Sequence, residues 1–228
     1  MTVLDALKYL PRRAVQSYAR GQSIIDSERP SQHLYVVIVG RVQITDEGCK
    51  TIADIVSAGG FFGESCLVDS SEHTQVAVAK AGVSLMAWTP DEIEQQIERD
   101  PRLGLALLQY LGRKCIVLQN RIDSMAGCKA PERLMLALVH LASDEDTEMM
   151  ADGAVRLRSL THQTIAGYIG TSREMVTLEM NRLRRLGMLK YNRKHFDVRL
   201  DEVRDELRRQ GVTVPAWRDE MQRSANNG

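Results

Sequence analysis

The sequence lacks any apolar segment long enough to cross a membrane. A spanning helix needs about 20 apolar residues, and no run of even eighteen occurs among the 228 residues. The opening stretch, MTVLDALKYLPRR, also lacks the apolar core of a secretory signal. We therefore expect a cytoplasmic protein that makes no membrane contact. The length leaves room for two small domains.

Cysteine is sparse and scattered. Cys49, Cys66, Cys115 and Cys128 form no CxxC pair and no zinc-finger spacing. A disulfide framework is typical of much shorter secreted chains. We expect reduced thiols rather than a metal site.

Net charge is also lacking, but the charges are segregated along the chain. The formal net charge is zero. Residues 1–100 hold nine Lys/Arg and fourteen Asp/Glu, whereas residues 155–195 hold nine Lys/Arg and two acids, a local balance of +7. A basic segment of this kind gains free energy from counterion release on a phosphate backbone. The second half of the chain is therefore the candidate nucleic-acid binder.

Short apolar, β-branched runs fill residues 13–88 and are separated by glycine and proline. Strands at this spacing are typical of an antiparallel sandwich or barrel. The predicted strands are Leu34–Val39, Arg41–Thr45, Thr51–Val56, Gln75–Ala79 and Val83–Trp88.

The pattern then changes to helices. Thr89, Pro90 and Glu92 have the spacing of a capping box with proline at the first helical position. A second helix is predicted from about residue 101 to Gly127. Its apolar residues recur at alternating spacings of three and four, a pattern typical of a helix that packs against the same helix of a second copy of the chain. The alternative is a helix buried against its own domain. The predicted seam is Leu108, Leu111, Cys115, Leu118, Ile122 and Met125.

Residues 160–189 predict two short helices joined by a tight turn. Thr161 is placed to cap the first helix, and Gly170 to end it. Thr171 opens the second helix, with Glu174 at capping-box spacing. Apolar residues form one face of the second helix (Val176, Met180 and Leu183), and polar residues form the other (Arg173, Glu174, Thr177 and Asn181).

Such a polar face suits base edges in a DNA major groove, although an ordinary helical hairpin with a solvated face has the same pattern. We expect Arg173, Glu174 and Thr177 to read bases. The following MLKYNRKHFDVRL predicts a β-hairpin that turns at residues 192–194. We expect Thr161, Arg193 and Lys194 to contact DNA phosphates.

Three motifs in this order resemble the cyclic AMP receptor protein/FNR (Crp/Fnr) family of bacterial transcription regulators. LYVVIVGRVQI (34–44) is similar to the sheet signature of cyclic-nucleotide-binding folds. GFFGESCLVD (60–69) is similar to the start of the phosphate-binding cassette. TSREMVTLEMNRLRRLGML (171–189) is similar to the recognition helix and the run into the wing.

The resemblance implies an α+β fold: an N-terminal antiparallel β-roll (a cyclic-nucleotide-binding-like jelly roll), a long dimerisation helix and a C-terminal winged helix-turn-helix. The implied domains are 1–99 (sensor), 100–129 (dimerisation helix and hinge), 130–200 (DNA-binding) and 201–228 (C-terminal extension). The implied partners are double-stranded DNA with a palindromic site, a second copy of the chain, and RNA polymerase. Arg173 and Glu174 match the family's base-reading pair, whereas Leu178 stands where arginine is frequent.

The predicted effector pocket departs from the family pattern for cyclic AMP. Its candidate residues are Gly63, Glu64, Ser65, His73 and Thr74. The family pattern places an arginine about ten residues after the cassette glutamate, but residues 72–75 read EHTQ. The purine-contacting Thr-Ser pair is also missing, since Leu118 and Gln119 fall there. Because burying a phosphate without a cation is costly, ordinary cyclic AMP binding is not expected, although a cyclic-AMP-gated regulator remains the alternative.

The sequence also bears on iron–sulfur sensing, haem sensing and enzymatic activity, and it favours none of them. Iron–sulfur sensing needs N-terminal cysteines, and none precedes Cys49. Haem is not expected, because His33, His73, Cys66 and Cys115 show no telling ligand spacing. Another small ligand, or none, remains open. GESCL (63–67) is not a nucleophile elbow, so we expect no enzyme.

Overall fold

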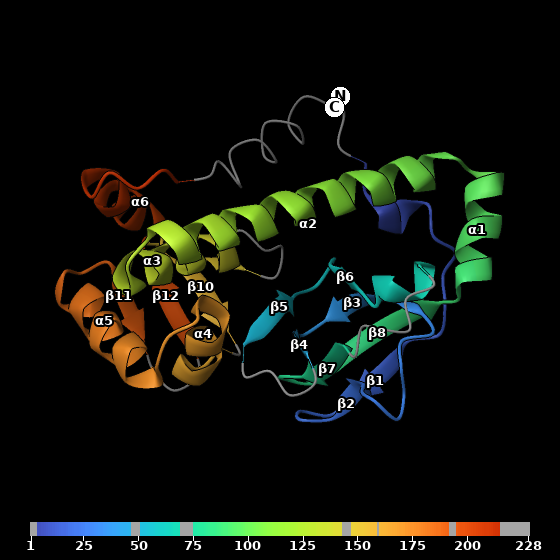
Figure 1. Ribbon diagram of the computed structural model, residues 1–228, viewed down its shortest axis with the longest axis horizontal. Coiled ribbons are helices and arrows are strands. Elements are labelled where there is room, and N and C mark those ends of the chain that lie inside the picture. The colour runs from blue at the N-terminus through green and yellow to red at the C-terminus, as the bar shows by residue number, and fades with distance from the viewer. Residues whose placement is uncertain are drawn as a thin grey trace. The chain divides into compact units, whose positions relative to one another are not determined.

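The computed structural model describes residues 4–46, 51–68, 75–142, 147–158, 160–191 and 195–214 (Figure 1). The chain divides into two compact units, Met1–Val117 and Leu118–Gly228. The division falls inside the long helix α2 (Arg102–Gly127). No helix of the described residues has the length and apolarity needed to cross a membrane.

The N-terminal unit is built on two four-stranded antiparallel sheets, which confirms the predicted β-roll. One sheet has the order β1-β8-β3-β6 and the other β2-β7-β4-β5. The first comprises β1 (Gln16–Tyr18), β8 (Val83–Trp88), β3 (Leu34–Val39) and β6 (Phe61–Phe62). The second comprises β2 (Ser23–Ile25), β7 (Gln75–Ala79), β4 (Val42–Asp46) and β5 (Ile52–Val56).

Strand β3 shows how the core of this unit is divided. Successive side chains of a strand point to opposite faces of the sheet. Tyr35 and Val37 pack into one apolar cluster, and Leu34 and Val36 into another. Both faces of β3 are therefore covered, which explains why its sequence is almost continuously apolar.

Helix α1 (Pro90–Arg99) covers the second of these clusters. It begins with the predicted capping box: Thr89 accepts from the backbone amide of Glu92, whose side chain accepts from the amide of Thr89. Ile93 is buried with Trp88 and Leu103, the last on the first turn of α2. A short 3-10 helix, Ala6–Lys8, adds Ala6 to the same cluster.

In the described part of the C-terminal unit, four helices follow α2 (Figure 1). They pack with a small antiparallel sheet of order β11-β12-β10-β9. The helices are α3 (Ala130–Leu141), α4 (His162–Ile169), α5 (Arg173–Arg185) and α6 (Leu200–Arg209). The strands are β9 (Glu148–Met149), β10 (Val155–Arg158), β11 (Leu189–Tyr191) and β12 (His195–Val198). This confirms the predicted helix-turn-helix and its wing hairpin.

Candidate nucleic-acid interface

The first helix of the helix-turn-helix begins and ends where the sequence predicts. The Thr161 hydroxyl accepts from the backbone amide of Thr164 at 3.0 Å and lies 2.9 Å from the Thr164 hydroxyl. Gly170 ends α4 with φ of +64°, in the left-handed region that glycine tolerates. As a phosphate contact Thr161 stays a prediction, and its hydroxyl already serves as the helix cap.

The cap of α5 differs from the prediction by one residue. Ser172, not Thr171, is the N-cap, and its hydroxyl accepts from the backbone amide of Met175 at 3.2 Å. Glu174 is therefore the second helical residue and forms no capping box with Thr171. Thr171 is the single residue between Gly170, which ends α4 in a left-handed conformation, and the Ser172 cap.

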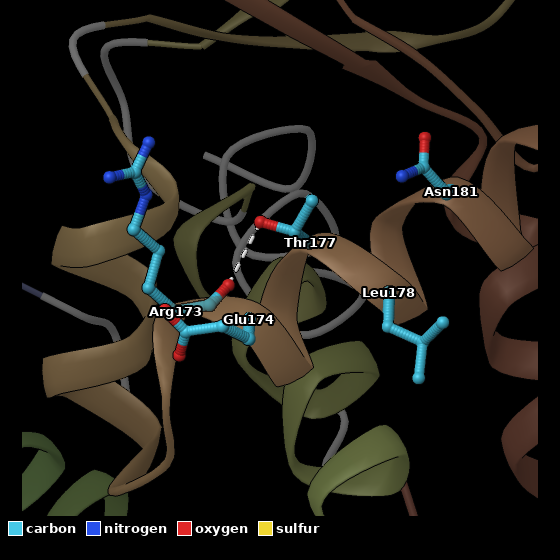
Figure 2. A pocket seen from close by; sticks show the side chains of 5 residues that line it. All are labelled: Arg173, Glu174, Thr177, Leu178 and Asn181. Carbon is cyan, nitrogen blue, oxygen red and sulfur yellow. Dashed lines mark hydrogen bonds between the residues drawn. The ribbon is translucent and has the colours of Figure 1, made fainter.

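The two faces of α5 divide as expected. Val176, Met180 and Leu183 are buried against the rest of the unit. The opposite face carries an open hollow (Figure 2). Its lining residues are Arg173, Glu174, Thr177, Leu178 and Asn181.

Arg173 and Glu174 stand exposed at the N-terminal end of α5. The pKa of the Glu174 carboxyl is lowered, first by a hydrogen bond from its own backbone amide and then by one from Ser172. A charged carboxylate at a helix N-terminus is also favoured by the helix dipole. This end of α5 thus presents a guanidinium that donates and a carboxylate that accepts, the two groups suited to guanine and cytosine edges.

The Thr177 hydroxyl is engaged inside the protein. It donates to the carbonyl oxygen of Arg173 at 2.9 Å, the bond drawn in Figure 2. It also lies 2.9 Å from Nδ1 of His162. Because a hydroxyl has one hydrogen, the Nδ1 of His162 must carry the proton in this pair. Thr177 therefore presents its methyl group and one remaining lone pair to a base.

His162 lies behind the recognition helix in an aromatic cluster that the sequence did not reveal. Its ring stacks on Phe196 at 5.9 Å between centroids and meets Tyr191 edge-on at 5.5 Å. Burial, and then the charge of Arg173, lower the pKa of His162. The first residue of α4 thus contacts both strands of the wing hairpin as well as α5.

Two backbone hydrogen bonds close the C-terminal end of α5, where the chain continues into the wing. Met188 donates to the carbonyl of Leu183 at 3.1 Å, and Gly187, with φ of +74°, donates to Arg184 at 3.1 Å. Strands β11 and β12 then pair in antiparallel register. The predicted phosphate contacts Arg193 and Lys194 lie outside the described residues.

In the N-terminal unit, Glu64, one of the predicted effector residues, belongs to an ion cluster. Lys114 of α2 places Nζ 2.6 Å from Glu64 Oε1 and 3.3 Å from Asp54 Oδ2. Burial acts to lower the pKa of Lys114, but the two carboxylates outweigh it, and the pKa lies above its usual value. We call Asp54, Glu64 and Lys114 the cassette ion cluster. It carries two negative charges and one positive charge.

Gly63 is fixed in this region by close contacts. Its φ is +81°, and a Cβ there would lie 2.5 Å from the carbonyl oxygen of His33. Glu64 and Ser65 follow it in a short 3-10 helix, Glu64–Leu67. His73 and Thr74, the other predicted pocket residues, lie outside the described part of the chain.

The thiols of the described residues differ in their surroundings. Burial raises the pKa of Cys66 to about 11, with the charge of Glu64 adding to the effect, so this thiol is protonated near neutral pH. Cys115 is exposed on α2. Over the described ranges, no three His, Cys, Asp or Glu side chains gather as metal ligands would.

The six residues of the predicted seam all lie on exposed positions of α2. Leu108 and Ile122 are the most open, at 67% and 65% exposed. Such large apolar side chains in water are unusual on one helix face. The alternative of a seam buried against its own domain is therefore wrong for the single chain.

Two family models match the two units. Residues 15–100 match the cyclic nucleotide-binding domain, and residues 132–212 match the Crp-like helix-turn-helix domain, which includes α6. The second match extends past the boundary at residue 200 that the sequence suggested.

Known proteins are similar over most of the chain. A CRP-like cAMP-activated global transcriptional regulator of Mycobacterium tuberculosis is 27% identical over 70% of this chain and 72% of its own. The global nitrogen regulator of Nostoc sp. is 25% identical over 81% of this chain and 84% of its own.

Among solved structures, a CRP/FNR-family transcriptional regulator from Thermus thermophilus has a TM-score of 0.65. It is 26% identical and the match covers 84% of this chain and 98% of that one. The two domain matches, their order and these relatives identify the chain as a DNA-binding transcription regulator rather than an enzyme. The chain belongs to the Crp/Fnr family of transcription regulators.

Proposed function

We propose that this regulator binds a palindromic DNA site as a homodimer and reads each half-site with α5. The observation that carries the proposal is the exposed Arg173–Glu174 pair at the capped N-terminus of α5. A guanidinium and a carboxylate on adjacent residues match the donor and acceptor pattern of a guanine beside a cytosine. The contribution of Thr177 is limited to its methyl group and one lone pair.

The exposed apolar face of α2 supports the homodimer. Two copies that pair along this face would remove Leu108, Ile122 and their neighbours from water, each fully buried leucine or isoleucine contributing about 1.5–3 kcal/mol. The family resemblance implies that such a dimer sets its two α5 helices on successive major grooves. Ile122→Lys should weaken the dimer without unfolding the chain, because Ile122 is exposed within one copy. Light scattering across a concentration series measures this, and an unchanged dimer would contradict the assignment.

We further propose that ordinary cyclic AMP binding does not gate the protein. The sequence has no arginine in residues 72–75. The carboxylate of Glu64 is already paired with Lys114, and Asp54 leaves the cassette ion cluster with an excess negative charge. An anionic ligand would meet this charge on entering, so another small ligand, or none, suits the cluster better. The proposal includes no haem and no iron–sulfur cluster.

The alternative function is a cyclic-AMP-gated regulator, and one observation favours it. Lys114 is a cation beside the cassette glutamate and would reach a phosphate if it left Asp54 and Glu64. One similar protein is named cAMP-activated, whereas another is named a nitrogen regulator. The names of relatives therefore do not decide between the two functions. RNA polymerase contact and a cytoplasmic location belong to the proposal through the family resemblance.

Selection of DNA from a random palindromic library, followed by anisotropy titrations at fixed salt, tests the proposed function. Arg173→Ala should lose about 5- to 150-fold in affinity for the selected duplex, because one bidentate base contact is worth about 1–3 kcal/mol. Arg209→Ala is the matched control: this exposed arginine on α6 pairs with Glu206 on its own helix. Equal losses in the two variants, or no selected sequence at all, would contradict the proposal.

A further inference from the structure

Asn181, a polar residue of the recognition face, is held from behind by the wing. Tyr191 is the last residue of β11, and its hydroxyl donates to Asn181 Oδ1 at 2.9 Å. Asn181 lies eight residues after Arg173 on α5, which corresponds to about 12 Å along the helix axis. In Figure 2 the two side chains lie toward opposite ends of the hollow.

Tyr191 is itself fixed by contacts on several sides. His162 meets its ring edge-on at 5.5 Å, and the ring of Phe196 lies 5.8 Å away. The guanidinium of Arg184 lies 5.3 Å from the centroid of the same ring. These contacts restrict the ring to one orientation, so the hydroxyl is presented to Asn181 in a defined place.

The hydrogen bond fixes how the Asn181 amide is oriented. A side-chain amide is planar, with the carbonyl oxygen on one side and the NH2 group on the other. Oδ1 has two lone pairs and Tyr191 occupies one of them, so the amide keeps one acceptor lone pair and two N–H donors on Nδ2. Asparagine recognises adenine by accepting from N6 and donating to N7, whereas guanine and thymine present acceptors in the major groove. An amide held in one plane can form such bonds only with base edges that match its orientation.

We infer that Tyr191 is a positioning residue for base recognition: by holding Oδ1 of Asn181, it fixes the plane in which this amide meets a base edge. A residue of the wing thereby sets part of the half-site sequence through α5. The inference rests on the proposed function, since it needs α5 in a major groove.

The test is the base preference of Tyr191→Phe, which removes one hydroxyl oxygen and keeps the ring. The duplex selected by the wild-type protein is varied to all four bases at each half-site position, and each duplex is titrated by competition anisotropy at fixed salt. We expect the wild type to discriminate among the four bases at the position that Asn181 contacts. The variant should relax that discrimination by about tenfold and leave the other positions unchanged.

Two control variants separate positioning from a general structural effect. Tyr18→Phe removes the same kind of bond in the N-terminal unit, where the Tyr18 hydroxyl donates to Gln16 Oε1 at 2.9 Å, and should leave every preference unchanged. Asn181→Ala should abolish the preference at that one position. Adding Tyr191→Phe to Asn181→Ala should then change nothing further.

The outcomes distinguish the inference from the proposed function. If the wild type selects DNA but Tyr191→Phe keeps the wild-type profile, the inference is wrong and the proposed function stands. A Tyr191→Phe shift that persists in the Asn181→Ala background would also overturn it, as would an Asn181→Ala protein with unchanged preferences. Failure of the wild type to select any sequence would refute the proposed function.

Discussion

Replacing Lys114 by glutamine should destabilise the N-terminal unit by about 3 kcal/mol. The Lys114 side chain is only 16% exposed and lies between two carboxylates that are 23% and 29% exposed. Removing one partner of a buried ion pair costs about 3–5 kcal/mol, because the remaining charge loses its compensation. We expect the lower end of this energy range for Lys114→Gln, since Asp54 and Glu64 keep some contact with water.

Urea unfolding followed by tryptophan fluorescence measures this loss. The chain has two tryptophans, and Trp88 is buried in the N-terminal unit. In a Trp217→Phe background, Trp88 therefore reports this unit alone. A loss of 3 kcal/mol corresponds to a fall in Tm of about 12 °C for a domain of this size.

Lys80→Gln is the matched control. Burial, and then the charge of Arg20, lower the pKa of Lys80. The surroundings of Lys80 therefore disfavour its charge, whereas those of Lys114 favour it. We expect Lys80→Gln to change the free energy of unfolding by less than about 0.5 kcal/mol. If Lys114→Gln costs no more than this control, the cassette ion cluster does not stabilise the unit as described.

The sign of the pH dependence gives a second check. Because the folded-state pKa of Lys114 is raised, its contribution is present below the unfolded pKa of about 10.4 and is lost as pH rises through the folded pKa. The difference between wild type and Lys114→Gln should therefore stay constant from pH 7 to about pH 10. Neutralising all three groups, with Asp54→Asn and Glu64→Gln added to Lys114→Gln, should recover most of the loss.

Two further predictions concern a glycine and an ion pair. Gly63→Ala should lower the free energy of unfolding by about 3 kcal/mol, because the new Cβ would lie 2.5 Å from the His33 carbonyl oxygen. Gly21 has a similar φ of +84° but open space around it, so Gly21→Ala should cost only about 1 kcal/mol. Equal losses of the two variants in chemical denaturation would contradict this. Asp197→Asn should cost about 2 kcal/mol at pH 7, because Arg156 donates two hydrogen bonds to this carboxylate at 2.7 and 2.9 Å. Since these bonds lower the pKa of Asp197, the loss should be constant above about pH 4 and shrink below it as the wild-type carboxyl is protonated; a loss that grows in acid would refute the assignment.

Local periodicity and caps were enough to predict most helices and the longer strands. The predicted ranges Leu34–Val39, Gln75–Ala79 and Val83–Trp88 coincide with β3, β7 and β8. The short strands β1, β2, β6 and β9, of two or three residues each, were missed because so few residues show no alternation. Their places in the sheets come from tertiary pairing.

The cap of α5 shows where local rules become ambiguous. Thr171 and Ser172 are adjacent and both suit an N-cap, so sequence alone does not choose between them. The left-handed exit at Gly170 makes the choice, because it fixes how many residues connect the two helices. The sequence placed Glu174 on the correct face despite the shift.

The partners of the site residues were beyond sequence reasoning. Lys114 pairs with Glu64 fifty residues earlier in the chain, and Tyr191 reaches Asn181 across the start of the wing. Such pairs depend on how elements pack rather than on spacing within one element. The sequence indicated which residues lie on the exposed polar face of α5, and the fold adds which neighbours orient them.

The most direct test of the account is apo-protein binding to the selected palindromic duplex, measured by fluorescence anisotropy at fixed salt with and without cyclic AMP. The account predicts tight binding that cyclic AMP changes by less than about twofold, because Lys114 already pairs with Glu64 and Asp54. Binding that appears only with cyclic AMP would contradict it and would mean that a cation of this chain serves the phosphate.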